Sequence, residues 1–243
     1  MAGNVGEAQT VVARYGRERY GARQIIARHR HRDFYAAVVL AGRYEEAGSE
    51  GRIEVSAGDV LVHSPFDAHL DRMSARGADI LNVALSFPVL AAAVPFGRIN
   101  DPDELVRCQE EDRESCAGLL LARLRPLRGR CADWPDVLHA QLSQQSARSL
   151  GAFAGEHGLR RETVSRRFAK LFGVSPAGYR AEARARRAWR RVIGEKTALA
   201  QIAYEEGFAD QSHMARAVKL LTGVPPGFWR RSNPFKTGAA TAP

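Results

Sequence analysis

The sequence predicts an α+β chain of several domains. A small N-terminal β-barrel and the helices that follow it precede an all-α C-terminal domain, in which a long helix joins two helix-turn-helix units. Short apolar runs separated by turn residues fill the first hundred residues, as is typical of small β-sandwiches and barrels. A helical pattern recurs in the last third at an offset of about fifty residues, which indicates a repeated structural unit. Residues 148–243 carry 18 Lys and Arg against 7 Asp and Glu, whereas residues 1–147 carry 18 against 20.

These shifts in pattern and charge set the expected domain boundaries. At 243 residues the chain is long enough for two separate cores. We expect small, polar, disordered tails at 1–10 and 233–243, a β domain at 11–100, a helical linker or dimerisation segment at 101–147 and a basic helical domain at 148–232.

Strand signals fall within residues 34–87. FYAAVVLAG is an apolar run that ends at Gly42, and RIEVSAGDVLVH alternates Ile53 and Val55 with polar neighbours before the turn at Gly58 and Asp59. DILNVALSF is a further apolar run. Apolar and β-branched residues at this regular spacing favour short strands of one small β domain.

Residues 102–147 return to a helical pattern. Two amphipathic helices are expected, with a break around Pro126 to Pro135. Their expected apolar positions are Leu105, Cys108, Cys116, Leu119, Leu120, Leu124, Val137, Leu138 and Leu142.

The first repeated unit, SLGAFAGEHGLRRETVSRRFAKLFGVSPAGY, predicts two helices joined by a tight turn. Gly158 offers the positive φ that ends the first helix. The apolar faces, at helical spacing, are Leu150, Phe153 and Ala154, then Val164, Phe168 and Leu171. With these residues buried, the second helix exposes Arg161, Glu162, Ser165, Arg166 and Lys170.

The second unit, ALAQIAYEEGFADQSHMARAVKLLTGVPPGFW, repeats this plan around a turn at Gly207. Asp210 is a good N-cap for its second helix. The expected apolar residues are Leu199, Ile202, Ala203, Met214, Val218 and Leu221, and the outward residues are Gln211, Ser212, His213, Arg216 and Lys219.

Strong helix formers that begin with Pro176 connect the two units. A helix of about 15 residues spans roughly 22 Å, and adjacent major grooves of DNA lie roughly 34 Å apart. Ala185 and Trp189 are expected in the core. Two interpretations stay open for the arginines of this helix, a solvated face or phosphate contacts, and both concern Arg184, Arg186, Arg187, Arg190 and Arg191.

The net charge of +11 over residues 148–243 lies on the repeated units. A basic domain beside a nearly neutral one is typical of a protein that binds the phosphate backbone of nucleic acid. Arginine pairs with guanine edges and glutamine with adenine in the major groove. The alternative is a solvated charged surface that needs no partner.

Residues 149–231 resemble the double helix-turn-helix domain of AraC/XylS-type bacterial transcription regulators. The family pattern LSRxFxxxxGxSPxxY occurs here as VSRRFAKLFGVSPAGY, and IAxxxGFxDQSHFxRxFKxxxGxxPxxFR occurs as IAYEEGFADQSHMARAVKLLTGVPPGFWR. Met214 and Val218 replace the usual phenylalanines, and Arg160 stands where a capping Ser or Thr is common. The resemblance implies base contacts from Glu162, Ser165 and Arg166 and from Ser212, His213 and Arg216.

The stretch HRHRDFYAAVVLAG, with AGDVLVHSPFDAH after it, resembles the cupin-like sensory domain found ahead of such DNA-binding domains. The resemblance rests on His29, His31, Gly42, Gly58, Asp59, Pro65 and His69. An HxH pair on one strand points both imidazoles to the same side, and a third His from a neighbouring strand completes a set for zinc or iron. Asp33 is a carboxylate candidate and His63 a spare ligand. The alternative is that these are polar residues at the barrel mouth.

The first hypothesis for function is a sequence-specific transcription regulator rather than an enzyme. Its implied partners are double-stranded promoter DNA, a small-molecule effector, RNA polymerase and a second copy, since a dimer binds two sites with a gain in effective concentration. The competing hypotheses are a cupin metalloenzyme and a metal sensor, both using His29, His31 and His69. Measuring metal stoichiometry together with catalytic turnover would separate the metalloenzyme from the metal sensor.

The remaining composition argues for a reduced, cytoplasmic protein. The longest apolar runs, such as VLAAAVPF at residues 89–96, are far shorter than a membrane span, and the N-terminus lacks the apolar segment of a signal peptide. Cys108, Cys116 and Cys131 lack metal-type spacing, so we expect thiols that serve in packing.

Overall fold

The chain divides into two units between residues 131 and 132. The computed structural model describes residues 8–11, 13–86, 94–127, 133–145 and 148–232. We call Ala8–Cys131 the N-terminal unit and Ala132–Thr237 the C-terminal unit. The sequence places this division at 147/148 instead. The difference arises because the helix Trp134–Ser143 packs on helices of the C-terminal unit.

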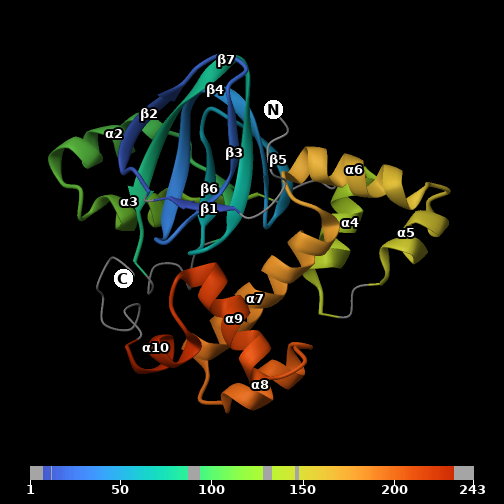
Figure 1. Ribbon diagram of the computed structural model, residues 1–243. Helices are drawn as coiled ribbons and strands as arrows, with labels where there is room; N and C mark the ends of the chain where they lie inside the picture. The colour runs from blue at the N-terminus through green and yellow to red at the C-terminus, as the bar shows by residue number, and fades with distance from the viewer. Residues whose placement is uncertain (1–7, 12, 87–93, 128–132, 146–147, 233–243) are drawn as a thin grey trace. The chain divides into compact units, whose positions relative to one another are not determined.

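The described part of the N-terminal unit is rich in strands and carries two helices (Figure 1). The strands are β1 (Gln9–Val11), β2 (Gly16–Tyr20), β3 (Ile25–His31), β4 (Tyr35–Gly48), β5 (Gly51–Ser56), β6 (Asp59–His63), β7 (Ala68–Ala84), β8 (Phe96–Arg98) and β9 (Arg125–Pro126). The helices are α2 (Pro102–Glu111) and α3 (Cys116–Arg123).

Within the described residues these strands form a single nine-stranded sheet in the order β1-β3-β7-β4-β6-β8-β9, with β2 paired to β7 and β5 to β4. The β1–β3 pair is parallel, and the other strand pairs are antiparallel. No described pairing joins β1 to β9, so the sheet does not close. The predicted α+β class is confirmed, whereas a closed barrel is not.

The three predicted strand regions correspond to β4, to β5 with β6, and to the last part of β7. Residue 87 lies outside the described residues. The predicted N-terminal tail is wrong at Gln9 and Thr10, because both pair with β3. Strands β1 and β2 escaped the sequence analysis because GRERY and QTV carry few apolar residues.

Buried apolar side chains of β4, β6 and β7 form the core of this unit. Val38, Val39 and Leu81 have essentially no exposed surface. The core cluster that lies on one face of the sheet includes Tyr35, Ala37, Val39, Tyr44, Ile53, Val55, Leu61, Met73 and Ile80.

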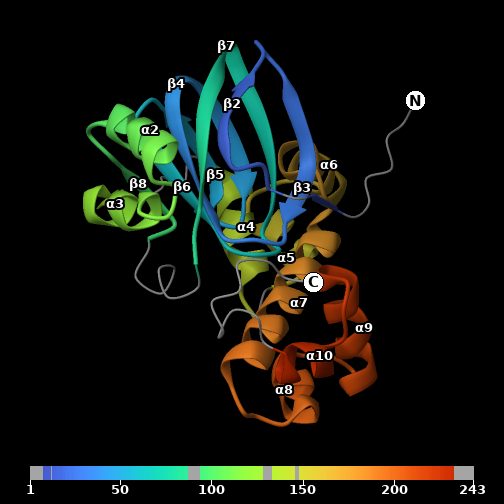
Figure 2. The same ribbon diagram turned by 90° about the vertical axis from the view of Figure 1, so that its left-hand side faces the viewer.

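Helices α2 and α3 pack on β4 and β7 through buried Leu105, Cys116 and Leu120 (Figure 2). Where two helices were predicted over residues 102–147, the described residues of this range form three, because α2 ends at a capped turn around Asp112 before α3 begins. Val137, expected in a core, is 39% exposed. Cys131 lies outside the described residues.

Two glycines let β2, β4 and β7 approach closely. Gly42 has φ +79° and Gly77 has φ +70°, a region that costs other residues energy. A Cβ on Gly42 would lie 2.2 Å from the Gly77 carbonyl oxygen, and one on Gly77 would lie 2.2 Å from the Tyr20 carbonyl oxygen. The backbones therefore occupy the space that a side chain would need.

Replacing Gly77 with alanine is expected to lower the free energy of unfolding of the N-terminal unit by about 2–3 kcal/mol, from left-handed strain and overpacking together. Thermal unfolding followed by far-UV circular dichroism would measure the loss. Gly21→Ala is the matched control, because the nearest atom to its added Cβ is the Gln24 side-chain oxygen at 3.7 Å. Equal stability of the two variants would contradict the expected clash.

The C-terminal unit is helical. Its helices are α4 (Trp134–Ser143), α5 (Leu150–Glu156), α6 (Arg161–Phe172), α7 (Pro176–Gly194), α8 (Leu199–Glu205), α9 (Gln211–Thr222) and α10 (Pro226–Arg231). The long helix α7 contacts α4 and α6 as well as α8, α9 and α10. Together these helices confirm the predicted plan of two helix-turn-helix units joined by a long helix (Figure 1).

Glycines and polar caps set the ends of these helices. Gly158 and Gly207 have φ of +62° and +74° at the two predicted turns. Gly173 and Gly223 close α6 and α9 in the left-handed conformation. Ser149 and Ser175 cap the N-termini of α5 and α7 through side-chain oxygens that accept backbone N–H groups.

The cores of the two helix-turn-helix units repeat each other, except that the last buried residue of the first unit is shifted by one position. Phe153, Val164 and Phe168 are fully buried there, but Phe172 is buried where Leu171 was expected, and Leu171 is partly exposed. In the second helix-turn-helix unit Ile202, Met214, Val218 and Leu221 are buried as predicted. Leu150 of the first and Leu199 of the second are only partly buried.

Helix α4 completes the core of the first helix-turn-helix unit. The His139 ring stacks on Phe172 with centroids 5.3 Å apart and meets Tyr179 edge-on at 5.1 Å. Ser143 Oγ lies 3.3 Å from the Tyr179 hydroxyl. This part of the predicted linker therefore belongs to the helical domain.

Among the described residues, no helix is both long enough and apolar enough to cross a membrane.

Candidate functional site

A cavity of about 860 Å³ lies among the strands of the N-terminal unit. This is within the size range of small-molecule sites in proteins, roughly 300–1,000 Å³. Its polar lining includes Glu18, His29, His31, Tyr35, Glu46, His63, His69, Asp71 and Asn82, and its apolar lining includes Val11, Ile26, Met73 and Ile80.

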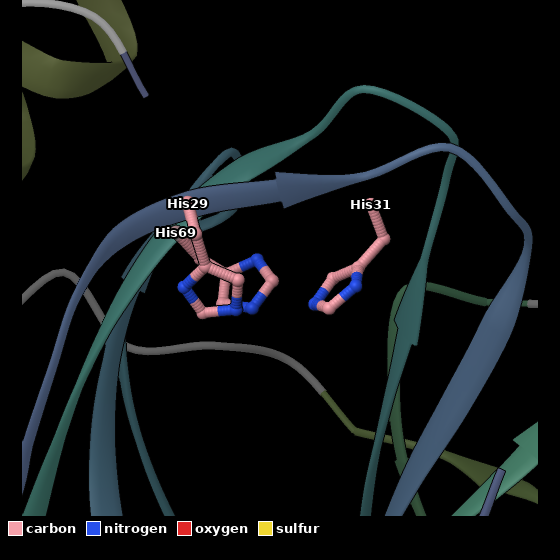
Figure 3. A group of neighbouring side chains, drawn as sticks. All are labelled: His29, His31 and His69. Atoms are coloured by element: carbon pink, nitrogen blue, oxygen red, sulfur yellow. The ribbon is translucent and has the colours of Figure 1, made fainter. Parts of the chain in front are cut away.

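Strands β3 and β7 bring the three predicted histidines together in this cavity (Figure 3). His29 and His69 face each other in the β3–β7 ladder, with ring centroids 4.3 Å apart. His31 follows two residues after His29 on the same face, and its ring lies 5.5 Å from that of His69. Each side chain offers a nitrogen, and the three nitrogens lie within 4.8 Å of one another.

A second group in the same cavity contains Glu46, His63 and His69, whose potential ligand atoms also lie within 4.8 Å of one another. Glu46 Oε2 lies 3.5 Å from His63 Nε2. Asp71 Oδ2 lies 3.9 Å from His69 Nε2, and the Tyr35 hydroxyl lies 3.4 Å from the same nitrogen.

Burial controls the ionisation of this cluster. Burial, together with a smaller effect of neighbouring imidazoles, lowers the pKa of His31 to about 4 and that of His63 to about 3. It also lowers the pKa of His29 and His69. Burial raises the pKa of the Glu46 and Asp71 carboxyls. The cavity thus holds neutral imidazoles, which is the form that binds metal ions.

The carboxylate suggested by the sequence, Asp33, is not part of either group among the described residues. Its carboxyl accepts a hydrogen bond from Tyr15 instead, and burial raises its pKa. Sequence analysis missed Glu46 and Asp71. Alternation would have found Asp71, which follows His69 by two residues on the same face of β7.

In the C-terminal unit, helix α6 places its predicted polar residues at the surface. Arg161, Glu162, Arg166 and Lys170 are exposed, and Ser165 is partly exposed. The opposite face carries the buried Val164, Phe168 and Phe172. Arg160 precedes the helix without a side-chain capping bond, as expected for arginine at that position.

Helix α9 presents the corresponding surface of the second unit. The Asp210 carboxylate accepts the His213 backbone N–H at 2.6 Å and so fixes the start of the helix. Gln211, Ser212, Arg216 and Lys219 are exposed. His213 is partly buried, because its ring packs edge-on against Phe208 with centroids 5.2 Å apart.

Several arginines of α7 contact groups of the protein itself. Arg187 donates to Glu206 Oε2 at 3.0 Å and to the Ser143 carbonyl at 2.7 Å. Arg191 pairs with Glu195, Glu205 and Glu206. Arg184 donates to the Gly207 carbonyl at 2.9 Å and lies over the Phe208 ring.

The other two α7 arginines differ in burial. Arg186 is buried, whereas Arg190 is exposed. Neither of the two interpretations left open by the sequence describes Arg184, Arg187 and Arg191, which tie α7 to neighbouring helices and turns.

Residues 153–232 match the family model described as a helix-turn-helix domain. The match begins in α5 and covers both repeated units through α10. The C-terminal unit carries a helix-turn-helix domain. A comparison with curated proteins finds no match.

The structural comparisons find distant likenesses to the AraC-type domain and to longer chains. A transcriptional regulator with an AraC-type DNA-binding domain from Chromobacterium violaceum is 22% identical, with 38% of this chain and 82% of that chain covered and a TM-score of 0.35. ToxT from Vibrio cholerae, with bound unsaturated fatty acid, is 12% identical, with 90% and 92% covered and a TM-score of 0.39.

The DNA-binding domain of AdpA, in complex with a target DNA, is 19% identical, with 43% of this chain and 96% of that chain covered and a TM-score of 0.39. All three TM-scores are low. The assignment of the helix-turn-helix domain therefore rests on the family model and on the repeated helices.

Proposed function

We propose that this protein is a sequence-specific transcription regulator that reads two adjacent major-groove segments of promoter DNA. The observation that carries the proposal is the exposed polar face of both α6 and α9, within a helix-turn-helix domain. In helix-turn-helix proteins the second helix of each unit enters the major groove.

The reading residues of the proposal follow from exposure. Arg166 and Arg216 are exposed near the middle of their helices and have the donor geometry that pairs with guanine. Gln211 and Ser212 stand at the start of α9, where a recognition helix contacts base edges. The proposed contact set, to bases or phosphates, is Arg161, Glu162, Ser165, Arg166, Lys170, Gln211, Ser212, His213, Arg216 and Lys219.

The connecting helix α7 has 19 residues, which corresponds to roughly 28 Å. A rigid connector of this length suits two reading helices placed about one DNA turn apart, roughly 34 Å. Arg187 of α7 donates hydrogen bonds to the Glu206 carboxylate and to the Ser143 carbonyl. These contacts hold α7 to both helix-turn-helix units.

We further propose that the N-terminal unit controls DNA binding through a ligand in its cavity. The cavity has the volume of a small-molecule site and a lining that combines apolar side chains with convergent polar groups. The two groups of potential ligand side chains in its lining make a zinc or iron ion a candidate ligand. The proposal includes no catalytic step. Contact with RNA polymerase and homodimer formation stay predictions from the sequence.

Selection of bound sequences from a random duplex library tests the DNA-reading function. The purified full-length protein is used at two salt concentrations. We expect enrichment of a motif with two elements about one helical turn apart. Binding that is salt-sensitive yet enriches no motif would leave only a basic domain that associates with phosphates, and would contradict the proposal.

A further inference from the structure

We propose that Glu46, His63 and His69 bind one divalent transition-metal ion inside the cavity of the N-terminal unit. This ligand set differs from the HxH-based set, because it takes a carboxylate from β4 and an imidazole from β6. As a site for the controlling ligand it rests on the proposed function, but the binding of the ion does not depend on DNA.

The geometry of the three side chains is already close to that of a metal site. Their potential ligand atoms lie within 4.8 Å of one another, and Glu46 Oε2 is 3.5 Å from His63 Nε2. Metal bonds of about 2.0–2.2 Å place ligands slightly closer together than this, so small side-chain rotations complete the site. The three side chains come from β4, β6 and β7, which are hydrogen-bonded neighbours in the sheet.

Two buried carboxyls beside these histidines favour a bound cation. Glu46 and Asp71 are 8% and 6% exposed, and within the described part of the chain their ion pairs are with His63 and His69 alone. Buried carboxyls that lack a Lys or Arg partner are costly. A bound divalent ion would compensate both of them.

Unpaired polar atoms strengthen this reading. Asp71 Oδ1 and His69 Nδ1 are buried without a hydrogen-bond partner in the described structure. Buried polar atoms nearly always have a partner in a protein or in its bound ligands. An ion on His69 with Asp71 beside it would give this pair the arrangement of a ligating imidazole supported by a carboxylate.

The choice between the two groups follows from charge, because both need His69. His29, His31 and His69 supply three neutral imidazoles and leave two positive charges uncompensated in a buried site. The group with Glu46 supplies one negative charge directly and has Asp71 next to His69. We therefore place the ion on Glu46, His63 and His69, with His29 and His31 beyond it.

The ligand types specify the class of ion. Two imidazoles with one carboxylate suit zinc, cobalt, iron and similar first-row ions. Magnesium and calcium prefer sets made of oxygen ligands. We accordingly expect binding of Co²⁺ and Zn²⁺ and no comparable binding of Mg²⁺ or Ca²⁺.

The test is a metal titration of the chelator-stripped full chain. Co²⁺ binding is followed by visible absorption, and Zn²⁺ content is measured after dialysis. We expect one ion per chain, and we expect Glu46→Gln and His63→Gln each to weaken binding about 100-fold or more, because even outer-shell partners are worth about 10–100-fold. Glu54→Gln, at an exposed glutamate of β5, is the matched control and should bind as the parent does.

Variants of the HxH pair decide between the two groups. His29→Gln and His31→Gln should weaken binding by no more than about tenfold, the lower end of the effect of outer partners. Loss of binding in these variants together with full binding in Glu46→Gln and His63→Gln would overturn the proposal, as would a parent chain that binds no Co²⁺ or Zn²⁺. Far-UV circular dichroism of each variant checks that the sheet still forms.

The same preparation separates this proposal from the proposed function. Metal binding with no DNA motif in the library selection would contradict only the regulator. A DNA motif with no metal binding would contradict only the metal site.

Discussion

Replacing both Arg166 and Arg216 with alanine is expected to weaken binding to the selected DNA sequence by about 2–6 kcal/mol, which is roughly 30-fold to 20,000-fold in Kd. Each arginine that pairs with a base is worth about 1–3 kcal/mol of discrimination. The two residues lie on different helices, α6 and α9, so their effects should add. Titration of labelled duplexes that contain either the selected or a scrambled sequence measures both affinities.

A matched control separates base contacts from charge. The double variant Arg167→Ala/Arg231→Ala removes the same net charge, yet Arg167 pairs with Asp133 and Arg231 lies at the end of α10. It should lower affinity for both duplexes by similar, smaller factors. If the Arg166/Arg216 variant lost the same affinity on both duplexes, these arginines would be phosphate contacts rather than base contacts.

Replacing Trp229 with alanine is expected to destabilise the C-terminal unit by about 3–5 kcal/mol, the usual cost of deleting a buried aromatic side chain. Trp229 has no exposed surface and meets Trp189 of α7 edge-on, with centroids 5.7 Å apart. Its Nε1–H donates to Thr222 Oγ1 of α9 at 2.8 Å. One side chain therefore joins α10 to α7 and α9, and its loss removes a large part of a typical domain stability of about 5–15 kcal/mol.

Intrinsic fluorescence is well suited to this measurement. The three tryptophans of the chain, Trp134, Trp189 and Trp229, all belong to the C-terminal unit. Urea unfolding of the Trp229→Ala variant, followed by the fluorescence of the other two tryptophans, should have its midpoint at a lower urea concentration than that of the parent. Trp229→Phe keeps most of the packing and loses the hydrogen bond, so it should cost about 1–2 kcal/mol. A Trp229→Ala midpoint equal to that of the parent would contradict the core role.

The C-terminal unit was largely predictable because its signals are local. Gly158, Gly207 and Asp210 act on the turn of chain in which they stand, and the apolar faces follow helical spacing. The shift from Leu171 to Phe172 could not be read from spacing. Both residues lie near the same stripe of α6, and the packing of His139 from α4 on Phe172 decides between them.

The N-terminal unit was less predictable because strand partners are distant in sequence. The HxH pair and His69 could be grouped by alternation and by their resemblance to a cupin-like domain. Glu46 could not be, since it lies opposite Asp71 in the β4–β7 ladder and meets His63 of β6 only through the way the sheet folds. Asp33 lies close to the HxH pair in sequence, but it bonds with Tyr15 instead.

The central place of β7 in the sheet also bears on the order in which the molecule is made. β7 pairs with β2, β3 and β4, and Gly16 at the start of β2 meets Asn82 near the end of β7. Contacts between residues so far apart in sequence make a fold slow to form. During synthesis the strands that precede β7 therefore keep unpaired edges until β7 has been made. The helix pairs that follow form through contacts between residues close in sequence.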